Sequence, residues 1–332
     1  MGQIRMAVVG AGSWGTTVAS VAAANTPTVL WARRPEVAET INSTHRNPNY
    51  LSSIALSPSL KASSSLVETV SDADVVVMAV PSQGFRATLQ EAAAHIRPWV
   101  PIVSLSKGLE PGSLLRMSQV ANDVMPGHPV AVLTGPNLAS EIAAGQPAAT
   151  VVAIDDAVIA TALQQLFSGS TFRVYTNPDV VGCEIAGVVK NVIAIASGIA
   201  MGMGFGDNTR ATLLTRGLAE MTRLAIALGG SAESLAGLAG MGDLIATCSS
   251  TASRNTTVGI RLGQGESIGD IVASTSMVAE GVRSSAVVWE LARQHGVDMP
   301  ITEQVVAVCH DNKSASDALI ALMSRQSRPE IQ

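Results

Sequence analysis

Lys190 lies in a stretch of the sequence that has no polar face. Residues 187–208 read GVVKNVIAIASGIAMGMGFGDN, and the part around the lysine is almost wholly apolar or small. A helix that is apolar on all sides is a buried helix, and a buried ammonium has a lowered pKa because it loses its hydration. We therefore expect Lys190 to donate and accept a proton near neutral pH. The alternative is a lysine at a helix end whose ammonium reaches solvent.

A glycine-rich turn stands near the start of the chain. Gly10, Gly12 and Gly15 form the pattern G-x-G-x-x-G, with Ser13 and Trp14 between them, after an apolar run over residues 4–10 and before a helical pattern. Such glycines let the backbone turn tightly and approach a pyrophosphate at the helix N-terminus. The setting predicts dinucleotide binding. A different mononucleotide fold or an S-adenosylmethionine fold that uses the same turn remains the alternative.

The end of the second predicted strand, residues 28–32, indicates which dinucleotide binds. NAD-selective sites place an acidic residue there to hold the ribose hydroxyls. This chain has Arg33 and Arg34 instead, and two guanidinium groups suit a 2′-phosphate. We therefore favour NADPH. An exposed basic pair is the alternative, and Glu36 close by leaves NAD open.

Further apolar runs alternate with helical patterns and predict a doubly wound parallel sheet of the Rossmann type. The runs cover residues 75–80, 101–105, 130–133, 149–154 and 172–175. Ligands of such sheets bind beyond the carboxyl ends of the strands. Pro81, Lys107 and Gly135 each follow a strand, so we expect them to line one crevice. Lys107 either meets an anionic ligand there or is a solvated loop lysine.

After residue 178 the pattern is helical only, which predicts a nucleotide-binding domain over 1–187 and an all-helical domain over 188–332. Asp243 follows a glycine-rich loop; it either faces Lys190 or caps the next helix. Ser253, Arg254 and Asn255 open another helix and offer a hydroxyl, a guanidinium and an amide beside free backbone N–H groups. That set suits a phosphate, although Ser253 alone is also an ordinary N-cap.

The composition excludes several classes of protein. The 332 residues carry a net charge of -5 and 3% aromatic residues, which argues against nucleic-acid binding. The three cysteines and five histidines are scattered, so no zinc framework is present and a reducing compartment fits. Because a strand pattern begins at once, we expect no signal peptide and a cytoplasmic protein. Lys190 and Asn191 interrupt the long apolar stretch, so we expect no membrane span.

Taken together, the motifs resemble those of bacterial NAD(P)-dependent glycerol-3-phosphate dehydrogenases. The similarity runs in collinear order through nearly the whole chain. The matching segments are GAGSWG (10–15), LSKGLE (105–110), TGPNLASE (134–141), VVKNVIAIASG (188–198), GFGDNTRA (204–211), GMGDL (240–244), SRN (253–255) and VAEG (278–281). The resemblance implies a Rossmann domain followed by an all-helical domain.

The resemblance also implies roles for individual residues. Those expected to contact NADPH besides the glycine turn are Ser13, Trp14, Arg33, Arg34, Tyr50, Lys107, Ala139, Arg254, Val278 and Glu280. Those expected to contact the substrate are Lys107, Gly135, Lys190, Asp243, Ser253, Arg254 and Asn255. Asn137 departs from the family, which often has Ser or Thr there, so one substrate hydrogen bond stays open.

The reaction implied is the reversible reduction of dihydroxyacetone phosphate to sn-glycerol 3-phosphate, without a metal, for phospholipid synthesis. Lys190 is then the proton donor and acceptor. A related hydroxyacid dehydrogenase that prefers a carboxylate substrate is one alternative. A dinucleotide sensor without turnover is another, although the buried lysine and the Ser-Arg-Asn triplet count against it. The apolar helical half is compatible with a homodimer.

Overall fold

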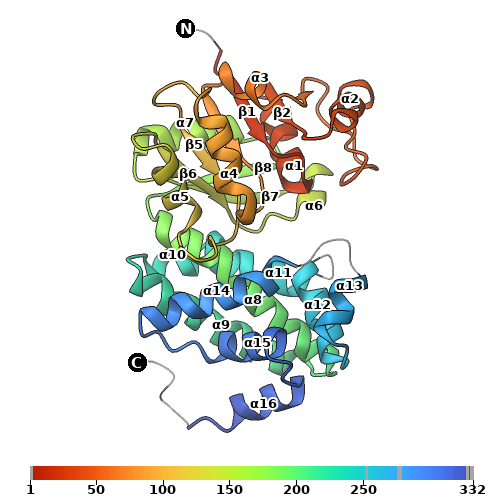
Figure 1. Cartoon of the computed structure of the whole chain (residues 1–332), viewed down its shortest axis with the longest axis vertical. Coiled ribbons are helices and arrows are strands. Elements are labelled where there is room, and N and C mark those ends of the chain that lie inside the picture. Colours follow the sequence, from red (N-terminus) through yellow and green to blue (C-terminus); the bar gives the residue numbers. More distant parts are fainter. Residues whose placement is uncertain (1–2, 251–252, 275–278, 327–328, 330–332) are drawn as a thin grey trace.

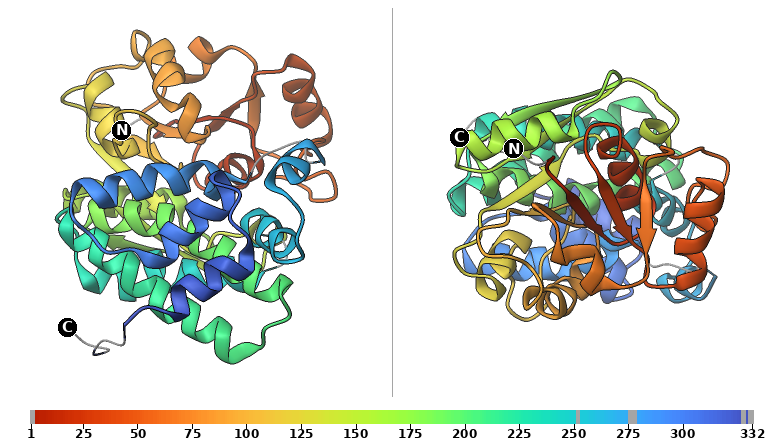
Figure 2. Two further views of the ribbon diagram at one scale, coloured as in Figure 1. Left: turned by 60° about the horizontal axis from the view of Figure 1, so that its bottom comes forward. Right: turned by 90° about the horizontal axis from the view of Figure 1, so that it is seen from above.

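The computed structural model describes residues 3–250, 253–274, 279–326 and 329. A sheet covered by helices forms the first part, and helices alone form the second (Figure 1). Seen from above, the sheet part lies over the helical part (Figure 2). The predicted architecture of a Rossmann-type domain followed by helices is therefore confirmed.

The sheet has eight strands in the order β3-β2-β1-β4-β5-β6-β7-β8. The strands are β1 (Met6–Val9), β2 (Thr28–Trp31), β3 (Lys61–Ser63), β4 (Val75–Met78), β5 (Ile102–Ser104), β6 (Val130–Thr134), β7 (Ala148–Ala153) and β8 (Phe172–Asn177). β1 and β4 read MAVV and VVVM and are buried throughout. Continuous apolar residues suit parallel strands that have helices on both faces.

Two features of the sheet differ from the sequence-based expectation of parallel strands. β6 and β7 pair antiparallel, and β8 runs with β7, whereas the neighbours from β3 to β6 are parallel. The connection holds only the short helix α6 (Ala139–Ala143), which does not carry the chain back across the sheet as a parallel crossover requires. The strand β3 was not predicted from the sequence, because it has only three residues, KAS, and two of them are polar.

Helices cover both faces of the sheet. One face packs against α1 (Ser13–Ala22), α2 (Pro35–Thr44) and α7 (Ala157–Phe167). The other packs against α3 (Leu66–Ser71), α4 (Ser82–Ala93) and α5 (Met117–Val124). Because β1 to β6 run parallel, their carboxyl ends lie at one shared edge of the sheet.

Helix α8 (Val180–Gly202) is the centre of the second part. Of the described helices it alone is long and apolar enough to cross a membrane, and 83% of its most apolar window is buried inside the protein, as in a core helix. The surrounding helices are α9 (Asp207–Ala227), α10 (Ala232–Ala236), the π-helical turn η1 (Leu238–Gly242), α11 (Asp243–Ser249), α12 (Arg254–Gly263), α13 (Ile268–Ser274), α14 (Glu280–Gln294), α15 (Pro300–His310) and α16 (Ala315–Met323). The division of domains after residue 187 stays a prediction, since α8 runs through that position without a break.

Glycines bring α8 and α12 into backbone contact. A Cβ atom at Gly198 would lie 2.2 Å from the carbonyl oxygen of Thr256, and one at Gly202 would lie 2.1 Å from that of Ile260. On α12, Gly259 and Gly263 face the same two positions, with Cα atoms 2.9 and 3.0 Å from those built Cβ atoms. The first turn of α12 is thereby held close to α8.

The glycine contact gives a stability prediction. Gly202→Ala is expected to lower the free energy of unfolding by about 1–3 kcal/mol, since the added methyl group has no space. Gly84→Ala in α4, where nothing lies within 4 Å, is the control and should be neutral or stabilising. Denaturant unfolding of both variants measures the difference; equal stabilities would contradict the predicted overlap.

A buried carboxylate in the helical part gives a pH prediction. Glu220 on α9 accepts hydrogen bonds from the backbone N–H groups of Ile301 (2.6 Å) and Thr302 (3.1 Å), and burial raises its pKa from 4.5 to about 7. Because the folded pKa is the higher one, this group favours folding most below pH 4.5 and loses that contribution as pH rises towards 7. The stability of Glu220→Gln relative to the native protein should therefore rise between about pH 5 and 7 and level off above. Unfolding curves across this range test it; a pH-independent difference would contradict it.

Candidate active site

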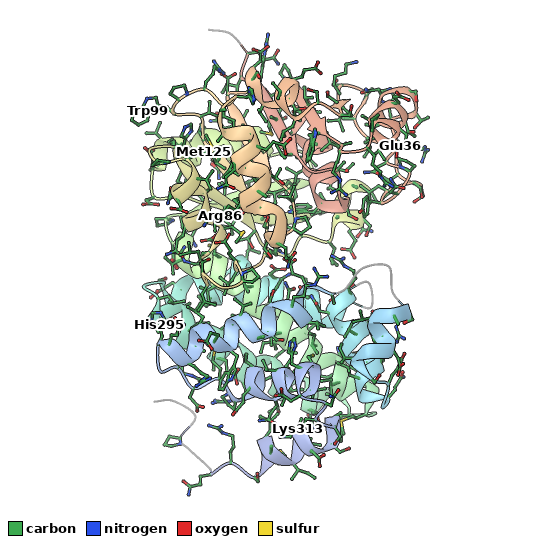
Figure 3. The ribbon with its side chains drawn as sticks, in the orientation of Figure 1. Glu36, Arg86, Trp99, Met125, His295 and Lys313 are labelled. Carbon is green, nitrogen blue, oxygen red and sulfur yellow. The ribbon has the colours of Figure 1, made fainter. Side chains whose placement is uncertain are left out.

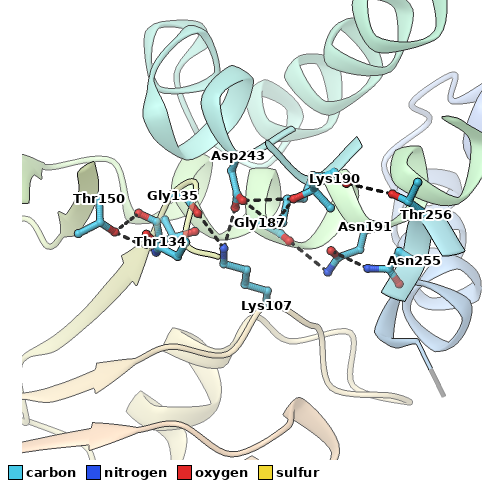
Figure 4. Close-up of polar contacts among 12 residues, drawn as sticks. Lys107, Thr134, Gly135, Thr150, Gly187, Lys190, Asn191, Asp243, Asn255 and Thr256 are labelled. Carbon is cyan, nitrogen blue, oxygen red and sulfur yellow. Dashed lines mark hydrogen bonds and ion pairs between the residues drawn. The ribbon is translucent and has the colours of Figure 1, made fainter. Parts of the chain in front are cut away.

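The ammonium of Lys190 is buried at the boundary between the sheet and the helices. Its residue is 6% exposed, and Nζ donates to Asp243 Oδ1 at 2.5 Å and to Thr247 Oγ1 at 2.7 Å (Figure 4). Lys190 lies in the middle of α8 rather than at its end. The alternative in which its ammonium reaches solvent is therefore excluded.

The surroundings of Lys190 set its proton affinity. Burial lowers the pKa of Lys190 from 10.5 to about 8; the carboxylate of Asp243 opposes that change and the ammonium of Lys107 adds to it. A pKa near 8 leaves both protonation states populated around neutral pH. The residue can therefore give and take a proton, as its sequence context predicts.

Asp243 joins two lysines. Its Oδ2 accepts from Lys107 Nζ at 2.7 Å while Oδ1 binds Lys190, and its residue is 1% exposed. Asp243 begins α11, but its carboxylate is turned to the lysines and does not cap that helix. The π-helical turn η1 lies directly before Asp243. Buried charges require partners, and here one carboxylate serves both ammonium groups.

Lys107 reaches this carboxylate from the carboxyl edge of the sheet. It follows β5, and its Nζ also donates to the carbonyl oxygen of Gly135, beyond β6, at 3.0 Å. The structure thus brings together Lys107, Gly135, Lys190 and Asp243 (Figure 4). Lys107 is not a solvated loop lysine, since its side chain is 16% exposed.

The start of α12 is the predicted phosphate cradle. Ser253 caps this helix by accepting from the N–H of Thr256 at 3.3 Å, and Arg254 is exposed. Asn255 is buried; its amide donates to Asn191 Oδ1 at 3.0 Å and accepts from the N–H of Gly281 at 2.9 Å. Ser253 and Asn255 therefore each have a structural role, and phosphate contact stays a prediction for all three residues.

The glycine turn fits a dinucleotide. Gly10 has φ +122°, and a Cβ there would lie 2.7 Å from Ala79 O; at Gly15 it would lie 2.1 Å from Gly10 O. These two glycines press the turn and α1 against β4. At Gly12 nothing lies within 4 Å, and α1 has no side-chain N-cap there. The open position at a helix N-terminus is where a pyrophosphate would bind.

Three other residues predicted to contact the cofactor are Trp14, Ala139 and Glu280, and each has contacts within the protein. Trp14 packs edge-on against Phe172, with ring centroids 6.3 Å apart, and its buried Nε1 has no partner among the described residues. Ala139 opens α6 and accepts at its carbonyl from Thr17 at 3.1 Å, which holds it beside α1. Glu280, whose pKa burial raises, accepts from Ser82 Oγ at 3.3 Å.

The basic pair lies between β2 and α2. Arg33 and Arg34 are exposed, with Arg34 Nε 3.8 Å from the carboxylate of Glu36, labelled at the edge of the molecule in Figure 3. Tyr50 is 41% exposed in the following loop. The side chains of all three residues are therefore open to solvent. Val278 lies outside the described residues.

Three residues in these networks were not predicted from the sequence to belong to the site. Thr247 is one helical turn after Asp243 on α11, a spacing that places both on one face, so it could have been found. Asn191 and Asn47 gave no such signal. Asn47 is fully buried in a polar loop and donates to Ala11 O at 3.0 Å, which fixes the loop against the glycine turn.

A glycine turn on a doubly wound sheet, set beside a helical part with a buried lysine, defines a dinucleotide-dependent dehydrogenase. Two family models match this chain, that of the NAD-dependent glycerol-3-phosphate dehydrogenase N-terminus over residues 5–160 and that of its C-terminus over residues 179–320. The chain belongs to this family, which makes it an NAD(P)-dependent oxidoreductase.

Similar proteins agree along their whole lengths. Glycerol-3-phosphate dehydrogenase (NAD(P)+) 2 of Sphingopyxis alaskensis is 55% identical over 97% of this chain and 96% of its own. Glycerol-3-phosphate dehydrogenase (NAD(P)+) of Thermobifida fusca is 52% identical over 98% of both chains. A crystal structure of glycerol-3-phosphate dehydrogenase from Coxiella burnetii has a TM-score of 0.92 and 35% identity, covering 97% of this chain and 99% of that one.

The lysine bridge predicts a pH effect. Asp243→Asn removes the charge that raises the pKa of Lys190, so that pKa should fall below about 8. Reduction needs the protonated amine, so the pH above which its rate declines should move down by about 1 unit or more. Initial rates of NADPH oxidation across pH measure it. Asp72→Asn, at an exposed carboxylate paired with Arg5, is the control and should leave the pH at which the rate declines unchanged. If that pH is also unchanged in Asp243→Asn, the role assigned to the bridge is contradicted.

Proposed function

We propose that the chain catalyses the reversible reduction of dihydroxyacetone phosphate to sn-glycerol 3-phosphate, with Lys190 as the proton donor and acceptor. The observation that carries the proposal is the buried ammonium of Lys190, bound to Asp243 at 2.5 Å and held beside Lys107. Family membership supports the same reaction. When bound, the nicotinamide supplies or takes the hydride.

In the reduction, Lys190 gives its proton to the oxygen that gains negative charge at C2. Asp243 keeps the lysine protonated before that step, and Thr247 fixes the direction of Nζ through the 2.7 Å hydrogen bond. In the oxidation, Lys190 takes the proton from the hydroxyl. A positively charged group aimed at the developing oxyanion also lowers the barrier electrostatically.

Substrate contacts are proposed for the groups around the lysine bridge and the start of α12. They are Lys107, Gly135, Lys190, Asp243, Ser253, Arg254 and Asn255. We add Asn137, because its amide donates to Thr150 Oγ1 at 3.0 Å while its buried Oδ1 has no partner among the described residues. Because a buried acceptor normally has a hydrogen-bond partner, Asn137 Oδ1 is suited to accept from a hydroxyl of the substrate.

For the cofactor, the open glycine turn and the exposed guanidinium pair support NADPH, with Arg33 and Arg34 on the 2′-phosphate. Glu36, which lies close to Arg34, is an acidic residue that could hold the ribose hydroxyls of NAD, so NAD is the second cofactor proposed. The three cysteines are free and buried, which supports the predicted cytoplasmic location. A homodimer stays a prediction.

The test is the fall in NADPH absorbance when dihydroxyacetone phosphate is added. Turnover with this substrate, and little with 2- and 3-keto acids, is expected. Preference for a keto acid would favour a hydroxyacid dehydrogenase. Binding of NADPH without turnover over a range of pH and salt would favour a sensor.

Replacing the lysine tests its role directly. Lys190→Ala should lower kcat by about a hundredfold or more, because the proposed proton donor is removed, while NADPH still binds in a fluorescence titration. Lys61→Ala, at an exposed lysine of β3, is the matched control and should keep the native rate. Near-native turnover in Lys190→Ala would refute the role assigned to Lys190.

A further inference from the structure

Glu184 ties α8 to the sheet part of the protein. It lies on the first turns of the helix that carries Lys190, its residue is 6% exposed, and its carboxylate accepts from Arg116 Nη1 at 2.6 Å. It also accepts from the backbone N–H of Ser118 at 2.8 Å and from the Ser118 hydroxyl. An anion at the first turn of α5 is well placed, because the free N–H groups and the helix dipole favour it there.

Arg116 ends the segment that carries Lys107. This segment, residues 105–116, runs from the end of β5 to the start of α5. Its own bonds stiffen it: Leu109 pairs with Arg116 in an antiparallel bridge, and the N–H of Glu110 donates to Leu115 O at 2.9 Å. The carboxylate of Glu110 also binds Arg86, which Figure 3 labels at the lower side of the sheet part. A shift at Arg116 is therefore passed on to Lys107.

We propose that Glu184 is a positioning residue for the reaction. It fixes the segment that carries Lys107 to the helix that carries Lys190, and so holds both ammonium groups on the carboxylate of Asp243. The inference rests on the proposed function, since it assigns a second anchor to the same site. Glu184 itself bonds to none of the three residues of that bridge.

The charge of Lys107 contributes to the lowered pKa of Lys190. Several charged or titratable groups surround Lys190, namely Asp243 and Cys248 of α11, Lys107, Glu280 of α14, and Arg254 of α12 beside Glu280. Of these, Lys107 belongs to the segment that Glu184 anchors, and its charge lowers the pKa of Lys190. If the anchor is lost, Lys107 moves off the bridge and the pKa of Lys190 rises.

Glu184→Ala is the variant that tests the anchor. We expect kcat/KM for dihydroxyacetone phosphate to fall about tenfold to a hundredfold, because small misplacements at a reacting centre have effects of that size. The pH above which reduction declines should move upwards, the direction opposite to that expected for Asp243→Asn. The Kd for NADPH should stay within about twofold. Glu184→Gln, which still accepts from Ser118, should lie between the native protein and Glu184→Ala in both quantities.

Glu220 provides a matched control. It is also a buried carboxylate that accepts from two backbone N–H groups and one hydroxyl at a helix start, but it ties α9 to α15 and bonds to no residue of segment 105–116. Glu220→Ala should lower the melting temperature as Glu184→Ala does. It should leave kcat/KM and the pH limb, the pH above which the rate of reduction declines, unchanged. A limb that moves in the Glu184 variants alone supports the proposal.

The proposal is overturned if the folded Glu184→Ala or Glu184→Gln protein keeps the native pH limb, whatever its rate. It is also overturned if Glu220→Ala moves the limb equally, since the effect would then be one of general destabilisation. Where Glu184→Ala does not fold, Glu184→Gln alone decides. If the native protein does not reduce dihydroxyacetone phosphate, the proposed function fails, and the pKa of Lys190 is then read by NMR of 13Cε-labelled lysine in the native protein and the same variants. A rise in that pKa supports the anchor, and no change refutes it.

Discussion

The site depends on one carboxylate shared by two ammonium groups, of which that of Lys190 is buried and that of Lys107 partly buried. The buried ammonium of Lys190 needs a partner to remain charged, and Asp243 lies 2.7 and 2.5 Å from the nitrogen atoms of Lys107 and Lys190. The three residues come from distant parts of the chain: a loop after β5, the middle of α8 and the start of α11. The packing of the sheet part on the helical part is therefore also the condition for the chemistry.

Local backbone features aim the groups of this bridge. Asp243 directly follows the π-helical turn η1, and its carboxylate is directed at the lysines and does not cap its own helix. Thr247, a turn further on, adds a second acceptor for Lys190. The glycine contact between α8 and α12 brings the helix start at Ser253 to the same region. The π-helical turn departs from regular helix geometry, and the glycines lack side chains; both features lie next to residues of the site.

The sequence predicted the architecture and the chemical groups better than their connections. The glycine turn, the apolar strands and the buried Lys190 each have a local signature, since spacing and burial follow from composition within one segment. The link from Asn191 through Asn255 to Gly281 has none, because three separate helices meet there. The reversal of β7 was missed for a similar reason: its apolar run is the same in either direction. Long-range pairings of this kind are decided by packing in three dimensions.

The glycine contact between α8 and α12 restricts how this protein can change during evolution. A methyl group at Gly198 or Gly202 would overlap a backbone oxygen of the facing helix, so neither helix can acquire larger residues along that line. The tilt of α12 is consequently not open to gradual adjustment by mutation. Exchanges of side chains along α12 are therefore expected at its exposed positions, such as Arg254 in the first turn.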